Sequence, residues 1–236
     1  MNDPRSSLIV ALDVPDRSAA LKAVENLTGH IGFFKIGLEL FTREGPRLVE
    51  EIRDRGEKIF LDLKLHDIPN TVKGAVRSVC ALGVQMLTVH ASGGPQMLAA
   101  ACQEAQSSAT PPLILAVTAL TSLSETDVRD LGIIGTTEQW VERLAGMAQQ
   151  SGIRGIVASA KELAMLRAKF GDQLQFVIPG IRPAGAALQD QSRAVTPSEA
   201  ILAGANYIVV GRPILQAPDP AAAADAIVKE IMHARP

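Results

Sequence analysis

Aromatic residues are scarce in this chain, at 3% of 236 residues, with one Trp and one Tyr. No charge of one sign dominates either, because 25 acidic and 23 basic residues leave a formal net charge of -2. Nucleic-acid-binding proteins usually combine an excess of positive charge with aromatic side chains on which bases stack. The composition therefore argues against a nucleic acid partner.

Cysteine is also rare. Cys80 and Cys102 are the two cysteines of the chain, and both lie in segments with a helical pattern. Two cysteines cannot form the framework that staples small secreted proteins, and no His or Cys stands beside them at the spacing of metal ligands. We expect two free, buried thiols and no metal site at either residue.

Long hydrophobic runs and low-complexity segments are missing. The first seven residues lead into a short apolar run that contains Asp13, which resembles neither a secretory signal nor a membrane span. This predicts a cytoplasmic protein without a membrane partner. No linker divides the chain, and a hydrophobic content of 47% can fill a large core. One domain over residues 1–236 is the simplest organisation.

Short apolar runs alternate with longer amphipathic ones along the whole chain. The runs typical of strands are Leu8–Val14, Phe33–Glu39, Lys58–Leu65, Met86–Ala91, Leu113–Leu120, Gly155–Ala160, Gln175–Ile181 and Tyr207–Ile214. The helical patterns are Ser18–Leu27, Gly45–Arg55, Thr71–Leu82, Pro95–Gln106, Thr137–Gln150, Lys161–Lys169, Pro197–Leu202 and Pro220–His233. Eight such units predict an α/β protein with a single (β/α)8 TIM barrel. An open six-stranded sheet with two extra units is the alternative, because periodicity does not prove closure.

Charged residues interrupt the third apolar run. Asp62 and Lys64 are two residues apart, so in a strand they project to the same face, while Leu61 and Leu63 project to the other. Burying these charges costs several kcal/mol per ion unless they satisfy each other. A sequence that needed only a core would carry Val or Ile here, so the pair indicates a functional site.

Other charges occupy the corresponding places of neighbouring strands. Asp13 ends the first run, Lys35 lies in the second, and Asp67 follows the third. In a (β/α)8 barrel, catalytic residues lie at the carboxyl ends of the strands and in the loops that follow. We therefore expect these charges to meet in one array, although a purely structural ion-pair network is the alternative.

Two further loops have the composition of a phosphate site. Barrels often bind phosphate with the loops after strands seven and eight, which here contain Gly180 with Arg182 and Gly211 with Arg212. Glycine allows the backbone to approach an anion, and the guanidinium matches phosphate oxygens. Residues 184–197 would form a long loop of the kind that often serves as a lid, with Gln191 as a candidate anion contact. We expect a phosphate-binding loop at about 182–197.

Taken together, these motifs resemble the orotidine 5′-monophosphate decarboxylase family along the whole chain. The matching segments are Ala11-Leu12-Asp13, Phe34-Lys35-Ile36-Gly37, the Asp-x-Lys-x-x-Asp-Ile-Pro-x-Thr stretch from Asp62 to Thr71, Leu120-Thr121-Ser122, Pro179-Gly180-Ile181-Arg182-Pro183, Asp190-Gln191 and Val210-Gly211-Arg212. The resemblance implies a cofactor-free and metal-free enzyme that releases CO2 from orotidine 5′-monophosphate to form uridine 5′-monophosphate, the last step of pyrimidine nucleotide synthesis.

The resemblance also implies a role for each matching residue. Lys64 resembles the proton donor to C6, flanked by Asp62 and Lys35. Asp67 and Thr71 are expected to enter the site of the partner subunit in a homodimer. The residues that resemble substrate contacts are Asp13 for the ribose, Thr121 or Ser122 for the pyrimidine, and Arg182, Gln191, Gly211 and Arg212 for the phosphate.

Two other functions share part of this pattern. A related barrel that acts on a β-keto sugar phosphate, as a decarboxylase or in an aldolase-like reaction, would carry the same Asp-x-Lys-x-x-Asp motif but would need a divalent metal for its enediolate. A non-catalytic phosphate-binding barrel would need Arg182 and Arg212 but not the charged array. His66 and His90 lie near strand ends, where either a site contact or simple packing explains a histidine.

Overall fold

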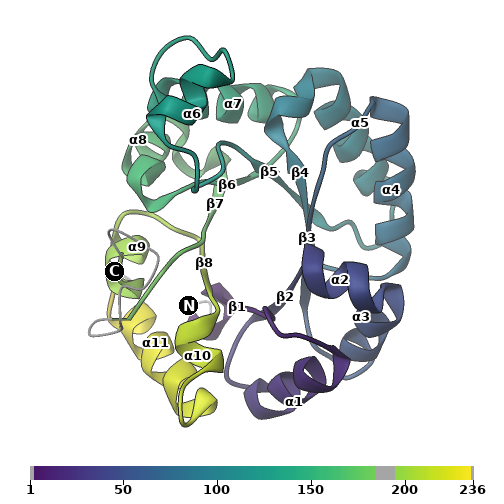
Figure 1. The fold of residues 1–236 in the computed structure, drawn as a ribbon, viewed down its shortest axis with the longest axis vertical. Coiled ribbons are helices and arrows are strands. Elements are labelled where there is room, and N and C mark those ends of the chain that lie inside the picture. The colour runs from purple at the N-terminus through teal and green to yellow at the C-terminus, as the bar shows by residue number, and fades with distance from the viewer. Residues whose placement is uncertain (1–2, 184–194, 235–236) are drawn as a thin grey trace.

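The computed structural model of the chain describes residues 3–183 and 195–234. Its strands form one closed parallel barrel in sequential order, in which the first strand pairs with both the second and the last. Figure 1 looks along this barrel, with the helices forming a ring around it. The strands are β1 (Leu8–Ala11), β2 (Phe33–Gly37), β3 (Ile59–Leu65), β4 (Met86–His90), β5 (Leu113–Val117), β6 (Gly155–Val157), β7 (Gln175–Ile178) and β8 (Tyr207–Val210). The prediction of a TIM barrel is confirmed, and the open six-stranded sheet is wrong.

Helices connect successive strands and cover the outer face of the barrel (Figure 1). They are α1 (Arg17–Leu27), α2 (Leu38–Glu44), α3 (Pro46–Arg53), α4 (Pro69–Ala81), α5 (Gly94–Gln106), α6 (Glu125–Asp130), α7 (Thr137–Gln150), α8 (Ala160–Phe170), α9 (Pro197–Leu202), α10 (Arg212–Leu215) and α11 (Pro220–Ala234). Short 3-10 turns lie at Pro4–Ser7, Ala91–Gly93 and Gly171–Gln173.

Alternation along the strands divides the core into two apolar clusters. Alternate residues such as Leu8, Val10 and Leu61 face the helices, and the residues between them face the barrel interior. The interior cluster is made of Ile9, Ala11, Phe33, Phe60, Met86, Leu115, Val177 and Val209. Charged and polar side chains follow these residues toward the carboxyl ends of the strands. Inside the barrel, the apolar cluster therefore lies below the charged residues and forms the bottom of their site.

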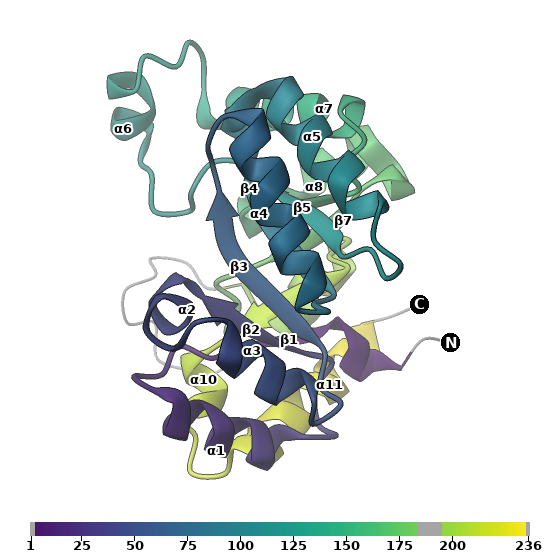
Figure 2. The same cartoon turned by 90° about the vertical axis from the view of Figure 1, so that its right-hand side faces the viewer.

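Seven of the eight predicted strands extend too far at their carboxyl ends. Leu38 and Glu39 belong to α2 rather than to the second strand, and residues 212–215 form α10 rather than continuing the last strand. Gly37 and Gly211 are the residues before these helices. Short apolar stretches carry too few residues to distinguish one helical turn from the end of a strand, which explains the errors. The helix α6 was not predicted either, and Figure 2 shows it projecting away from the barrel body.

The longer helices begin where the sequence carries starting signals. Thr136 and Ser159 cap α7 and α8, each with a Gln or Glu three residues later that completes a capping box. Such caps pair backbone N–H groups that the first helical turn leaves without partners. Both free cysteines lie in helices, with Cys102 buried and Cys80 half-buried, so the expectation of burial is correct for one of them. In the described ranges, no helix is both long and apolar enough to cross a membrane.

Candidate active site

The charges of the third strand meet inside the barrel. Lys64 Nζ lies 2.8 Å and 2.9 Å from the two carboxylate oxygens of Asp62. The side chain of Asp62 is only 13% exposed and that of Lys64 is 28% exposed. Their neighbours Leu63 and Leu65 pack on the opposite side, against the cluster that faces the helices. The two-residue spacing therefore correctly predicted a shared face and a direct ion pair.

Two more charges extend this pair into an alternating array. Lys35 Nζ, on β2, lies 3.6 Å from Asp62 Oδ2 and 3.5 Å from Asp13 Oδ1. Lys35 is 12% exposed, whereas Asp13 at the rim is 62% exposed. The order across the barrel mouth is thus acid, base, acid, base, as expected from the sequence. We call Asp13, Lys35, Asp62 and Lys64 the charged array.

Asp62 is ionised despite its burial. Burial by itself raises the pKa of this carboxyl, but the charges of Lys35 and Lys64, with hydrogen bonds from Lys64 and Thr88, outweigh it. The net effect is a pKa below the ordinary value for aspartate. A carboxylate that stays charged at neutral pH can pair with the ammonium groups of both lysines beside it. The array therefore presents fixed positive charge in a partly closed site.

The backbone at Lys64 is unusual. Among the described residues, Lys64 is the only non-glycine residue with a positive φ, at 50°. This left-handed conformation costs roughly 1–2 kcal/mol for a residue with a Cβ, and such strain gathers at functional sites. The pairing of β3 with β4 is irregular at the same place. Leu61 pairs with Leu87 and Leu65 pairs with Val89, so the segment of β3 between these pairs is longer than the segment of β4 opposite it. Lys64 therefore sits in a bulge.

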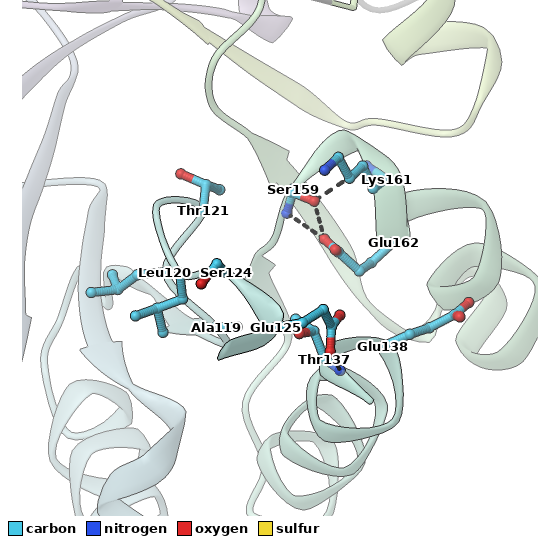
Figure 3. A pocket seen from close by; sticks show the side chains of 11 residues that line it. Ala119, Leu120, Thr121, Ser124, Glu125, Thr137, Glu138, Ser159, Lys161 and Glu162 are labelled. Carbon is cyan, nitrogen blue, oxygen red and sulfur yellow. Dashed lines mark hydrogen bonds between the residues drawn. The ribbon is translucent and has the colours of Figure 1, made fainter. Parts of the chain in front are cut away.

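The array lines a small pocket, and a second, larger pocket lies after the fifth strand. The pocket of about 130 Å³ is lined by all four residues of the array together with Gly37. The larger one, about 370 Å³, lies between the loop after β5 and the first residues of α7 and α8 (Figure 3). Thr121 lines this larger pocket, while Ser122 is exposed on the same loop. The structure thus places the two candidate pyrimidine contacts outside the pocket of the charged array.

The loop after β3 carries the residues expected to reach a partner subunit. Asp67 and Thr71 are both exposed, and Asp67 Oδ1 accepts a hydrogen bond from the Ile68 N–H at 2.6 Å. In the part of the chain that the structure describes, no ion pair joins Asp67 to Lys64. Ile68, which lies between Asp67 and Thr71 in the sequence, has an apolar side chain that is 66% exposed. Within one chain, then, Asp67 stands apart from the array.

The candidate phosphate loops lie at the ends of β7 and β8. Gly180 has a φ of 76°, which explains why glycine stands there, and Arg182 is buried while Arg212 is exposed at the start of α10. A Cβ at Gly211 would lie 3.5 Å from Asp13 Oδ2, so the second loop adjoins the charged array. Gln191 lies outside the described residues.

The nearest histidines flank the lysine end of the array. The rings of His66 and His90 are 5.4 Å apart between centroids. Burial first, and then electrostatic interactions with His66 and Lys64, lower the pKa of His90. The neutral form of His90 is therefore favoured at physiological pH. The described residues include no group of three or more His, Cys, Asp or Glu side chains arranged to hold a metal ion.

Comparison with known proteins assigns the chain to a family. The model of the orotidine 5′-phosphate decarboxylase / HUMPS family matches residues 6–227. The chain belongs to this family. A curated orotidine 5′-phosphate decarboxylase of Moorella thermoacetica is 49% identical over 233 residues, which cover 96% of this chain and 92% of the relative. Its counterpart from Halorhodospira halophila is 50% identical over 227 residues, covering 96% of both chains. The resemblance drawn from the motifs is therefore confirmed.

Solved structures agree with this assignment. The crystal structure of orotidine 5′-phosphate decarboxylase from Lactobacillus acidophilus is similar to this fold with a TM-score of 0.86 and 40% sequence identity, and the match covers 95% of this chain and 98% of the other. The described fold is therefore shared over nearly all of its length with a solved orotidine 5′-phosphate decarboxylase.

One member of the site escaped the sequence analysis. Thr88 is fully buried on β4, and its hydroxyl contacts both Asp62 and the backbone of Lys64. A signal existed in the run from Met86 to His90, because a polar residue at the alternate position of a buried strand faces the barrel interior. Threonine is common in strands as an ordinary β-branched residue, which is why the pattern did not single it out.

Proposed function

We propose that this chain decarboxylates orotidine 5′-monophosphate to uridine 5′-monophosphate and CO2, without a cofactor or a metal and with Lys64 as the proton donor. The observation that carries the proposal is the alternating array of Asp13, Lys35, Asp62 and Lys64, with Lys64 Nζ held on Asp62 at 2.8 Å. The names of the curated relatives supply the substrate.

The chemistry calls for fixed positive charge. When the bond from C6 to the carboxylate breaks, its electron pair stays at C6 in an orbital in the plane of the ring, where the π system cannot delocalise it. The Lys64 ammonium can stabilise this charge and then transfer one proton from Nζ to C6. Lysine is left neutral and regains a proton from water after product release. Asp62 orients the ammonium and keeps it charged, and Lys35 adds a second positive charge beside it.

The remaining residues would bind the substrate. Asp13, at the exposed rim of the array, suits the ribose hydroxyls, and Thr121 or Ser122 would contact the pyrimidine edge after the loop behind β5 moves inward. The phosphate would be held by Arg182 from the loop at 182–197 and by the residues at the start of α10. These last contacts are Gly211 and Arg212, with Gln191 as a further one. Binding energy from the distant phosphate can then be used at the reacting carbon.

We also propose that the functional unit is a homodimer in which Asp67 and Thr71 enter the partner's site. Both side chains are exposed, and among the described residues Asp67 forms no ion pair with the charged array. Ile68, exposed beside them, supplies apolar surface of the kind that interfaces bury. In the dimer, Asp67 would bring a second carboxylate near the Lys64 ammonium.

The decisive experiment measures CO2 release from orotidine 5′-monophosphate in the presence of a chelator. The wild-type chain should remain fully active, and Lys64→Ala should lose activity by many orders of magnitude while still binding nucleotide through the phosphate loops. Orotidine, which lacks the phosphate, should be a very poor substrate. Loss of wild-type activity with chelator would favour the metal-dependent alternative, and binding without turnover would favour a phosphate-binding barrel.

A further inference from the structure

Thr88 is a polar residue in the buried part of β4. It lies between Leu87 and Val89, and its side chain is fully buried. A buried hydroxyl is costly unless it is hydrogen-bonded, so its partners explain why it is tolerated there. Thr88 Oγ1 lies 2.9 Å from Asp62 Oδ1 and 2.8 Å from the backbone nitrogen of Lys64.

The direction of both hydrogen bonds is determined by chemistry. A hydroxyl carries one proton, and an ionised carboxylate can only accept, so the Thr88 proton is donated to Asp62. The backbone N–H of Lys64 can only donate, so it uses a lone pair of the same oxygen. One hydroxyl thus connects the carboxylate of Asp62 with the main chain of Lys64. Both hydrogen bonds require the side-chain oxygen of Thr88.

The bulge in β3 explains why that connection is needed. Between Leu61 and Leu65 the regular pairing with β4 is interrupted. Within this irregular stretch the Lys64 N–H donates to the Thr88 hydroxyl rather than to a backbone carbonyl. Lys64 also has a φ of 50°, which a residue with a Cβ adopts only where its surroundings hold it. The Thr88 hydroxyl contacts this backbone directly.

We propose that Thr88 is the positioning residue of the Lys64–Asp62 pair, and that its hydroxyl both maintains the left-handed backbone of Lys64 and orients the carboxylate that Lys64 Nζ contacts. Thr88 faces the pair from the floor of the site, beside Met86, and takes no part in substrate contact. Its role in turnover rests on the proposed function, whereas its role in the backbone conformation does not.

The test compares Thr88→Val, which keeps the shape but lacks the hydroxyl, with Thr88→Ser, which keeps the hydroxyl. Thr118→Val is the matched control, because Thr118 is also buried in the barrel and donates its hydroxyl to the Val157 carbonyl at 3.1 Å, away from the array. Thr88→Val should lower kcat for orotidine 5′-monophosphate by roughly 10- to 100-fold with little change in KM, as expected for misplacement of a catalytic group. Thr88→Ser should restore most of kcat, and Thr118→Val should leave it within about twofold.

Normal kcat in Thr88→Val, or an equal loss in Thr88→Ser, overturns the proposal. If Thr88→Val does not fold, Thr88→Ala replaces it, since this variant also lacks the hydroxyl and adds no methyl group against Asp62. A crystal structure of the hydroxyl-free variant gives a readout that does not depend on turnover, because Lys64 should leave the left-handed region. An unchanged φ at Lys64 overturns the proposal even if the wild-type chain proves inactive on orotidine 5′-monophosphate, an outcome that by itself contradicts only the proposed function.

Discussion

Asp62→Asn is the substitution that most directly tests the energetics of the charged array. Asparagine has nearly the same shape as aspartate and can still accept hydrogen bonds from Thr88 and Lys64 through its carbonyl oxygen. The change therefore removes one negative charge and leaves the packing intact. Lys35 and Lys64, at 12% and 28% exposure, would then lie in the barrel mouth without the carboxylate between them.

The expected loss of stability follows from the distances. At an effective dielectric constant near 20, a carboxylate attracts an ammonium with about 6 kcal/mol at 2.8 Å and about 5 kcal/mol at 3.6 Å. The variant no longer pays the desolvation of a buried carboxylate, which offsets several kcal/mol of this loss. Removing one partner of a buried ion pair costs about 3–5 kcal/mol in other proteins, and we expect the same here.

Urea unfolding at neutral pH measures this difference, with Asp54→Asn as the control. Asp54 is an exposed aspartate that pairs with Arg53 at 2.7 Å, and surface pairs of this kind contribute at most about 1 kcal/mol. The pH dependence gives a second check. Because the pKa of Asp62 is lowered from 3.8, its charge stabilises the folded state above pH 3.8, and this contribution disappears as pH falls through the folded-state pKa. The difference in unfolding free energy between the wild type and Asp62→Asn should therefore become smaller at acidic pH.

If Asp62→Asn lowers the unfolding free energy by less than about 1 kcal/mol at neutral pH, as the Asp54→Asn control should, the expected contribution of the buried ion pairs is refuted. It would mean that water screens Lys35 and Lys64 despite their burial. The same result would remove the main argument for a preorganised site, because an array that is weak in the folded state cannot present fixed charge to a reacting carbon.

Four further outcomes are expected. Mixing inactive Lys64→Ala and Asp67→Ala chains under conditions of subunit exchange should restore roughly a quarter of wild-type activity, since half the dimers are mixed and each has one intact site. Arg212→Ala should reduce kcat/KM by roughly 2 to 4 kcal/mol, measured by steady-state kinetics. The free energy of unfolding should fall as pH decreases below 6.5, because the pKa of His90 is lowered by burial and neighbouring charges and the unfolded chain binds the proton more readily; His90→Gln should reduce this slope. Arg167→Met should cost about 3 kcal/mol in urea unfolding, because the guanidinium donates to the Gly171 carbonyl and to Asn206 and lies 4.7 Å from the Phe176 ring.

Each of these outcomes has a contrary result. No recovery on mixing, with exchange verified by native mass spectrometry, contradicts the shared site. Equal kcat/KM for nucleotide and nucleoside contradicts the phosphate role of Arg212, and an unchanged acid slope in His90→Gln contradicts the assignment to that residue. For Arg167, the control is the exposed Arg47, which pairs with Glu51 on its own helix; equal losses of unfolding free energy in Arg47→Met and Arg167→Met would contradict the prediction.

Much of the site was predictable because it depends on strand geometry. The two-residue period placed Asp62 and Lys64 on one face, and the rule that barrels react at the carboxyl ends of strands brought Asp13 and Lys35 to the same place. The helix at Thr137–Gln150 was predicted with its observed bounds, and in the structure Thr136 and Gln139 form a capping box at its start. The bounds of α2 and α10 were missed, since a single apolar turn carries no period of its own.

The sequence by itself determined the alternating elements, the positions of the charges along them and the family motifs, because these depend on local period and residue type. Tertiary structure alone decided that the sheet closes, that Lys64 lies in a bulge with a left-handed backbone, and that Thr88 of the next strand supplies its hydrogen-bond partner. Register between neighbouring strands is a property of the pair, and no pattern within one strand encodes which residue of the other will stand opposite. The bulge at Lys64 is therefore visible only in the folded barrel.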